Sequence, residues 1–163
     1  MQNNSPAPLG RVASLHLHPQ ISGEPLQSVN EIEAVDGKGI LGEPRFFGKL
    51  NREGQPSHRQ ITLMEREQIN DHGAAFGIEI SPGRVRSNIE TSGLKLVELV
   101  NRDIQVGDAV LHISETRTGC AKMDAICHGL REASGNGRLG VIAQVVKSGT
   151  IRVGDEISIP ASS

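Results

Sequence analysis

The stretch Ala109-Val110-Leu111-His112-Ile113-Ser114 alternates apolar and polar side chains over its last four residues. A period of two residues is typical of a β-strand with one buried face. Elsewhere in the chain Gly and Pro are frequent and the apolar stretches between them are short, which favours strands over long helices. The sequence therefore predicts strands over residues 11–18, 31–35, 60–64, 85–90, 109–114, 140–147 and 156–159.

Two helices are predicted beside these strands, a short one over about residues 64–72 and one that follows Cys120, over about residues 121–132. Strands and helices do not alternate regularly, as they would in a βαβ repeat. The predicted fold class is therefore mainly β, a single β-barrel with a few peripheral helices. Three acidic residues are expected on the solvated face of the first helix, namely Glu65, Glu67 and Asp71.

The chain has 163 residues, which suits one domain of ordinary size. We predict that this domain spans residues 10–160 and that residues 1–9 form a disordered polar tail. The first residues lack the basic start and apolar stretch of a secretory signal. No apolar run approaches the roughly 18 residues of a membrane span, and two cysteines are too few for a disulfide scaffold. We expect a cytoplasmic protein with reduced thiols and no membrane partner.

Charge and aromatic content argue against nucleic acid as a partner. The formal net charge is -2, whereas binding to a polyanion needs a basic face. The chain has no Trp, no Tyr and three Phe, so it lacks aromatic platforms for stacking bases. A ligand would therefore be held by backbone groups, cations and small polar side chains.

Cys120 lies between a strand-like and a helix-like segment, with Arg117 and Lys122 close by in the sequence. A helix N-terminus and neighbouring cations lower the pKa of a thiol below its free value of about 8.5. The resulting thiolate would be a nucleophile and a soft metal ligand. Local sequence equally allows a small, half-buried side chain at a loop.

A second pair of candidate ligands, His16 and His18, is spaced for one face of a strand. Two such imidazoles could chelate a metal ion. A polar outer face, with Leu15 and Leu17 pointing inward, explains the same pattern.

Several segments in order, from Arg11 to about Ile157, resemble the MOSC domain. This family is named for the C-terminal domain of molybdenum cofactor sulfurases and also occurs as small stand-alone bacterial proteins. The matching pieces are Val12-Ala13-Ser14-Leu15, Gly37-Lys38-Gly39-Ile40-Leu41-Gly42, His58-Arg59-Gln60-Ile61-Thr62-Leu63-Met64-Glu65, Gly83-Arg84-Val85-Arg86-Ser87-Asn88-Ile89, Val106-Gly107-Asp108, Thr116-Arg117-Thr118-Gly119-Cys120, and Gly140-Val141 through Gly149-Thr150-Ile151-Arg152-Val153-Gly154-Asp155.

Two positions depart from the family pattern. The family often has proline directly before the cysteine, where this chain has Gly119. Many relatives also have Asp-Arg-His after the early glycine turn, where this chain has Glu43-Pro44-Arg45.

The resemblance implies a β-barrel and a molybdenum-pterin cofactor whose metal is bound by Cys120, which would also be the catalytic residue. A thiolate is a soft ligand that suits such a centre. The pterin carries an anionic phosphate tail, which arginine, small polar side chains and backbone N–H groups can hold. The candidate cofactor-binding residues are Arg59, Arg84, Arg86, Ser87, Asn88 and Arg117. Arg84 and Arg86 point to the same face if Val85 is in a strand.

Three functions remain open at this point. The first is a molybdenum-dependent oxidoreductase acting on N-hydroxylated or related small substrates; it would need an external electron donor, because no flavin, haem or iron–sulfur motif is visible. The second is a sulfur carrier with a persulfide on Cys120, loaded by a sulfur donor protein. The third is a module that binds the cofactor without turnover. The pyridoxal-phosphate domain of full sulfurases has no counterpart here, so persulfide could not be generated by that route.

Overall fold

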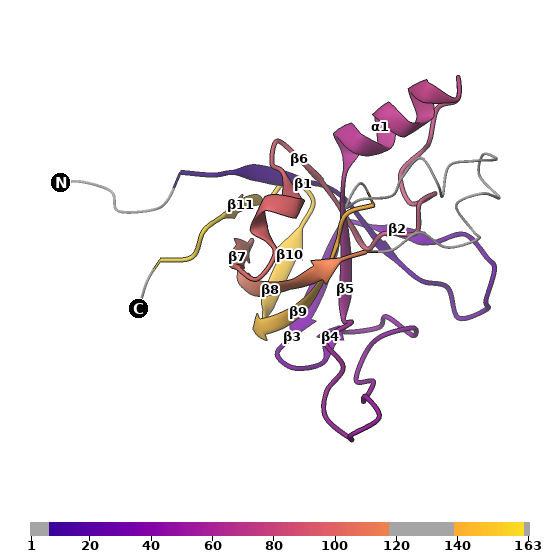
Figure 1. Cartoon of the computed structure of the whole chain (residues 1–163). Coiled ribbons are helices and arrows are strands. Elements are labelled where there is room, and N and C mark those ends of the chain that lie inside the picture. The colour runs from indigo at the N-terminus through magenta and orange to yellow at the C-terminus, as the bar shows by residue number, and fades with distance from the viewer. Residues whose placement is uncertain (1–6, 118–138, 162–163) are drawn as a thin grey trace.

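The computed structural model of the chain describes residues 7–117 and 139–161 (Figure 1). These residues contain eleven strands, one α-helix and one short 3-10 helix. The strands are β1 (Gly10–Leu17), β2 (Gln27–Val29), β3 (Glu31–Val35), β4 (Gly39–Ile40), β5 (Ile61–Glu65), β6 (Ile89–Ser92), β7 (Asp103–Val106), β8 (Ala109–Thr116), β9 (Val141–Lys147), β10 (Gly149–Arg152) and β11 (Glu156–Ser158). The helices are α1 (Arg66–Ala75) and the 3-10 helix η1 (Leu96–Leu99).

Seven strands form a closed barrel in the order β11-β7-β8-β9-β5-β6-β1, and β11 pairs back with β1 through Gly10 and Ile157. Strand β2 extends the sheet beyond β1, while β10, β3 and β4 form a separate three-stranded sheet. The predicted single barrel is therefore confirmed.

Neighbouring strands of the barrel are antiparallel except β5 and β6, which are parallel. Parallel neighbours need a crossover connection, and α1 lies in it. In Figure 1 this helix stands outside the strands, at the opposite end of the molecule from β3 and β4.

The barrel interior is filled by branched apolar side chains. The largest of those that are fully buried there are Leu15, Ile40, Ile61, Leu63, Ile89, Leu96, Ile104, Leu111 and Ile113. Strand β5 is buried on both faces, because Leu63 points into this core while Met64 packs with Ile69 of α1 in a second cluster. A strand covered on both faces is mostly apolar, which explains why β5 lacks the alternation seen in β8.

Most predicted strands are confirmed to within one or two residues, and the first predicted helix corresponds to α1. The helix expected after Cys120 lies outside the described residues. Four short strands were not predicted, namely β2, β4, β7 and β10. Each has only two to four residues, too few to show a repeating pattern.

The strand predicted over residues 85–90 is wrong in its first half, because β6 begins only at Ile89. Residues 82–85 form a turn, and the backbone takes positive φ values at Gly83 (86°) and Arg86 (61°). Val85 is buried, but it packs in the second cluster beside α1 and is not part of a strand. The apolar side chain that suggested a strand serves this cluster instead.

The expected solvated face of the first helix is also partly wrong. Glu67 and Asp71 are exposed, but Glu65 is the last residue of β5 and only 7% exposed. Its Oε2 accepts the backbone N–H of Leu96 at 3.1 Å. Burial raises the pKa of the Glu65 carboxyl, and the nearby charges of Glu67 and Glu98 add to this, while the Leu96 N–H and Lys95 oppose it.

The two ends of the described chain meet at one place on the barrel, where the N–H of Leu9 donates to the carbonyl oxygen of Ile157 at 2.7 Å. The predicted boundaries of the domain and of the tail stay predictions. In the part of the chain that the structure describes, no helix is both long and apolar enough to cross a membrane.

Candidate functional site

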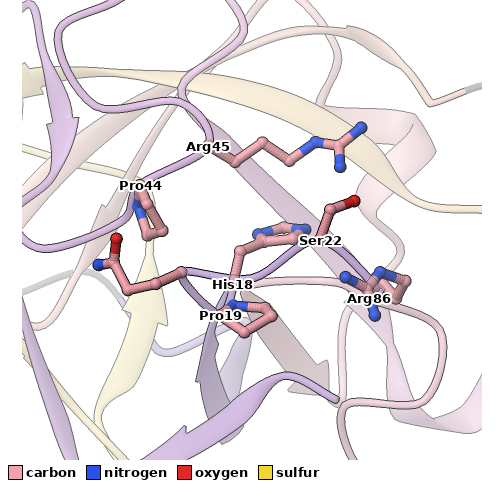
Figure 2. A pocket seen from close by; sticks show the side chains of 7 residues that line it. His18, Pro19, Ser22, Pro44, Arg45 and Arg86 are labelled. Atoms are coloured by element: carbon pink, nitrogen blue, oxygen red, sulfur yellow. The ribbon is translucent and has the colours of Figure 1, made fainter. Parts of the chain in front are cut away.

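A hollow of about 190 Å³ lies where three loops meet beside the end of β1 (Figure 2). The loops are the segment after β1, the segment after β4 and the turn before β6. We call it the His18 hollow; it is lined by His18, Pro19, Gln20, Ser22, Pro44, Arg45 and Arg86.

Glu43 is fully buried beside this hollow, where its carboxylate is held by His18, Arg45 and Asn88. Its Oε2 accepts the His18 N–H at 3.0 Å and the Asn88 Nδ2 at 2.7 Å, and lies 2.9 Å from the His18 Nδ1. Its Oε1 accepts the N–H of Arg45 at 3.0 Å. Burial alone would raise the pKa of Glu43, but hydrogen bonds from the His18 ring, Arg45 and the His18 backbone, with the charge of His18, lower it overall. Glu43 is therefore a carboxylate at neutral pH.

The imidazole of His18 is fixed on two sides. Its Nδ1 faces Glu43, and its ring packs edge-on against Phe46 with the centroids 5.5 Å apart. The side chain is 7% exposed and lines the hollow, and its Nε2 makes no hydrogen bond to any described residue. One ring nitrogen of a buried histidine is thus available to a ligand.

The expectation that His16 and His18 form an outer polar face is wrong. Both are buried, because loops cover this end of β1, while Leu17 is only half-buried. The two rings also have separate partners, since His16 Nδ1 lies 2.9 Å from the Ser87 carbonyl oxygen. Among the described residues, no group of three or more His, Cys, Asp and Glu side chains is arranged to hold a metal ion.

The turn at residues 82–86 is anchored by Glu90, which is fully buried. Glu90 Oε2 accepts the N–H of Gly83 at 2.7 Å, and its Oε1 accepts the Arg66 Nε at 3.0 Å. Arg66 also donates to the carbonyl oxygen of Ile80 at 2.7 Å. A partly buried, hydrogen-bonded ion pair between Arg66 and Glu90 holds the turn in place.

Two predicted arginines lie on this turn. The prediction that Arg84 and Arg86 share one face assumed a strand at Val85, and it fails because Val85 is in a turn. Both arginines nevertheless line a second hollow, of about 220 Å³, whose lining also includes Ser81, Pro82 and Gly83. Arg86 also lines the His18 hollow and donates through Nη1 to the carbonyl oxygen of Glu24 at 3.1 Å. Arg84 is exposed.

Arg117 ties the end of β8 to the same turn. Its Nη2 donates to the carbonyl oxygens of Val85 at 2.9 Å and Arg86 at 3.3 Å. Its N–H donates to the carbonyl oxygen of Gly140 at 3.0 Å. The last residue described before the gap at 118–138 therefore lies beside the residues that follow the gap. Cys120, the predicted metal ligand, lies outside the described residues.

Ser87 and Asn88 are fully buried and bonded to the protein itself. Ser87 Oγ is within hydrogen-bond distance of the Thr62 and Ile89 carbonyl oxygens. Asn88 Nδ2 donates to the carbonyl oxygen of His16 at 3.1 Å as well as to Glu43. In this arrangement both side chains brace the segments around the hollow, and direct contact with a cofactor stays a prediction.

Arg59 is exposed just before β5 and does not line either of the two hollows described above. Its cofactor role likewise stays a prediction.

Sequence reasoning missed Glu43 and Arg45 as site residues and gave His18 only a metal or surface role. Glu43-Pro44-Arg45 stood out only as a departure from a family pattern, and no local pattern indicates that its carboxylate is buried.

The closed seven-stranded barrel places the chain among small barrel proteins of known structure. The YuaD protein from Bacillus subtilis is similar with a TM-score of 0.74 and 19% identity, covering 91% of this chain and 93% of that one. YiiM from Geobacillus stearothermophilus gives a TM-score of 0.69 and 15% identity, covering 93% and 75%. YiiM from Escherichia coli gives a TM-score of 0.65 and 17% identity, covering 94% of this chain and 71% of that one.

Residues 46–158, well over half of the chain, match the family model of the MOSC domain. The chain therefore belongs to the MOSC domain family. A search of the curated proteins gave no match.

Proposed function

We propose that this protein binds the molybdenum-pterin cofactor, with the Cys120 thiolate as the protein ligand of the metal. Family membership gives the class of cofactor. The observation that carries the proposal is the link from Arg117 to the turn at residues 82–86, which lines both hollows. Cys120 follows Arg117 by three residues, a chain length of at most about 11 Å.

The described residues fit the anionic part of such a cofactor. Arg84 and Arg86 converge on one hollow, and a guanidinium is the side chain best suited to hold phosphate with two parallel hydrogen bonds. Glu90 and Arg117 would keep the turn in position, and direct contact of Arg117 with the cofactor stays a prediction.

The bound metal would supply two-electron redox chemistry. The protein would position a small substrate next to it and exclude competing ligands. We propose an oxidoreductase that takes its electrons from a separate donor protein, with N-hydroxylated or related compounds as the substrate class.

The test is to measure molybdenum, pterin and sulfane sulfur together on protein purified under low oxygen from a host that makes the cofactor. Near-stoichiometric molybdenum and pterin would support the proposal. Sulfane sulfur without metal would replace it with the persulfide carrier. Bound cofactor that no electron donor can turn over would reduce it to a binding module.

A further inference from the structure

We propose that the loop between β4 and β5 docks the protein that donates electrons, and that this donor presents a carboxylate-rich surface. The contact is made by residues 49–57, which we call the finger, through an exposed leucine and the cations beside it in the sequence. The identity of the partner as an electron donor rests on the proposed function. The docking surface itself requires neither molybdenum nor Cys120.

The finger is an ordered hairpin. At its base, the N–H of Ser57 donates to the carbonyl oxygen of Lys49 at 3.0 Å. Nearer its tip, the N–H of Asn51 donates to the carbonyl oxygen of Gln55 at 2.8 Å, and the Asn51 Oδ1 accepts the N–H of Gln55 at 3.0 Å. A loop that is held by its own hydrogen bonds loses little conformational freedom when a partner binds.

The apolar anchor of the finger is Leu50, whose side chain is 65% exposed. Its backbone is fixed by a bridge to Pro56. In Figure 1 the connection between β4 and β5 extends beyond the strands, at the end of the molecule opposite α1. A leucine on such a protrusion offers apolar surface that a partner can remove from water.

Cations without ion-pair partners accompany this leucine. Residues 44–59 contain one acidic residue, Glu53, and four arginines or lysines. The four are Arg45, Lys49, Arg52 and Arg59. None of their side chains makes an ion pair with a residue that the structure describes. Because the whole chain has a formal net charge of -2, this loop is a positive region on a chain that is otherwise acidic.

The combination of local positive charge and one apolar side chain fits an acidic protein. A nucleic acid would extend its phosphates over the acidic remainder of the surface, and the finger has no aromatic ring on which a base could stack. A single leucine is too small an apolar face to anchor the chain in a membrane. Small contacts that are steered by charge are typical of encounters between redox proteins.

The finger begins close to the candidate site. Phe46 packs edge-on against His18, with the ring centroids 5.5 Å apart. Leu50 follows Phe46 by four residues, a chain length of at most about 14 Å. A donor docked on the finger would therefore reach the neighbourhood of the His18 hollow.

The test uses the purified full-length protein and two acidic electron carriers as probes, a flavodoxin and an iron–sulfur ferredoxin. We expect at least one carrier to cause saturable shifts in the backbone NMR signals of the finger. Its binding should weaken at least about tenfold between ionic strengths of about 0.01 M and about 0.15 M, because the Debye length falls from about 30 Å to about 8 Å.

Two variants with the same change of charge locate the contact. Lys49→Glu/Arg52→Glu should weaken carrier binding at least about tenfold, because like charges would then meet in the contact. Lys95→Glu/Arg102→Glu, at two exposed positions outside the finger, should weaken it by less than about threefold, since distant exposed charges are screened. Leu50→Ala should weaken it about fivefold through the lost apolar contact. All five side chains are exposed, so these variants should fold.

The proposal is overturned by three results, namely no saturable binding of either carrier, equal weakening in the two double variants, or signal shifts confined to residues outside the finger. A single-stranded oligonucleotide or anionic phospholipid vesicles that bind the finger more tightly than both carriers would also overturn it, in favour of that class of partner. Carrier binding at the finger of a protein that takes up no molybdenum would support the docking surface and overturn the proposed function. Stoichiometric molybdenum without carrier binding would do the reverse.

Discussion

The side-chain amide of Asn88 donates to the buried carboxylate of Glu43 at 2.7 Å and thereby joins the start of β6 to the loop after β4. The same amide accepts the N–H of Thr62 on β5 at 3.1 Å and donates to the carbonyl oxygen of His16 on β1 at 3.1 Å. One asparagine therefore connects two barrel strands to the loop that carries Arg45. The rim of the hollow is set by the barrel and not by the loop alone.

Replacement of Glu43 tests this arrangement through the pH dependence of stability. Because folding lowers the pKa of Glu43, its stabilisation is present above the ordinary value of 4.5 and is lost as the pH falls through the lower, folded value. Glu43→Gln should cost about 1–3 kcal/mol at neutral pH, and its difference from the wild type should shrink below pH 4.5. Urea unfolding at several pH values measures this. Glu53→Gln, at an exposed position, is the control, and a difference that persists in acid would contradict a stabilising role for the Glu43 charge.

The charge of Glu65 should lower the stability of the fold at neutral pH, whereas the charge of Glu43 should raise it. Its pKa is raised by burial, so ionisation costs stability as the pH rises from 4.5 through the folded value. Glu65→Gln keeps an oxygen for the Leu96 N–H and removes the charge. The variant should be at least as stable as the wild type at neutral pH and should lose any advantage below pH 4.5. Thermal unfolding beside the exposed variant Glu79→Gln checks this; a loss of stability in Glu65→Gln that is confined to neutral pH would refute it.

Gly140 is constrained by both its conformation and its surroundings. Its φ is 82°, and a Cβ there would lie 2.0 Å from the carbonyl oxygen of Leu63. Gly54 has a similar φ of 79°, but a Cβ there would have nothing within 4 Å. Gly140→Ala should lose at least about 2 kcal/mol more than Gly54→Ala. Denaturant unfolding of the two variants makes the comparison, and similar losses would mean that the contact with β5 is unimportant.

Arg86 lines both hollows, so its removal should weaken retention of the intact cofactor. We expect Arg86→Ala to lower the molybdenum and pterin content after gel filtration by at least about tenfold. Arg102→Ala, at an exposed position outside both hollows, should retain the wild-type content. Equal retention by the two variants would exclude Arg86 from the cofactor site.

The barrel could be predicted because its strands carry strong local patterns, as in the alternation from Leu111 to Ser114. The turn at Val85 could not, since an apolar residue packs as well beneath a helix as within a strand, and local sequence does not distinguish the two. The local sequence likewise does not predict that Glu43 and His18 are buried. Carboxylates are rarely fully buried unless paired, and the partners of Glu43 include residues 25 and 45 positions away along the chain.

The role of Cys120 is decided by the molybdenum content of wild-type, Cys120→Ser and Cys127→Ser proteins purified under low oxygen from a cofactor-producing host. Cys127 is the matched control, because it is the other cysteine of the chain. We predict near-stoichiometric molybdenum in the wild type, retention in Cys127→Ser and loss in Cys120→Ser. Equal molybdenum in the two variants, or none in the wild type, would contradict the assignment of Cys120 as the metal ligand.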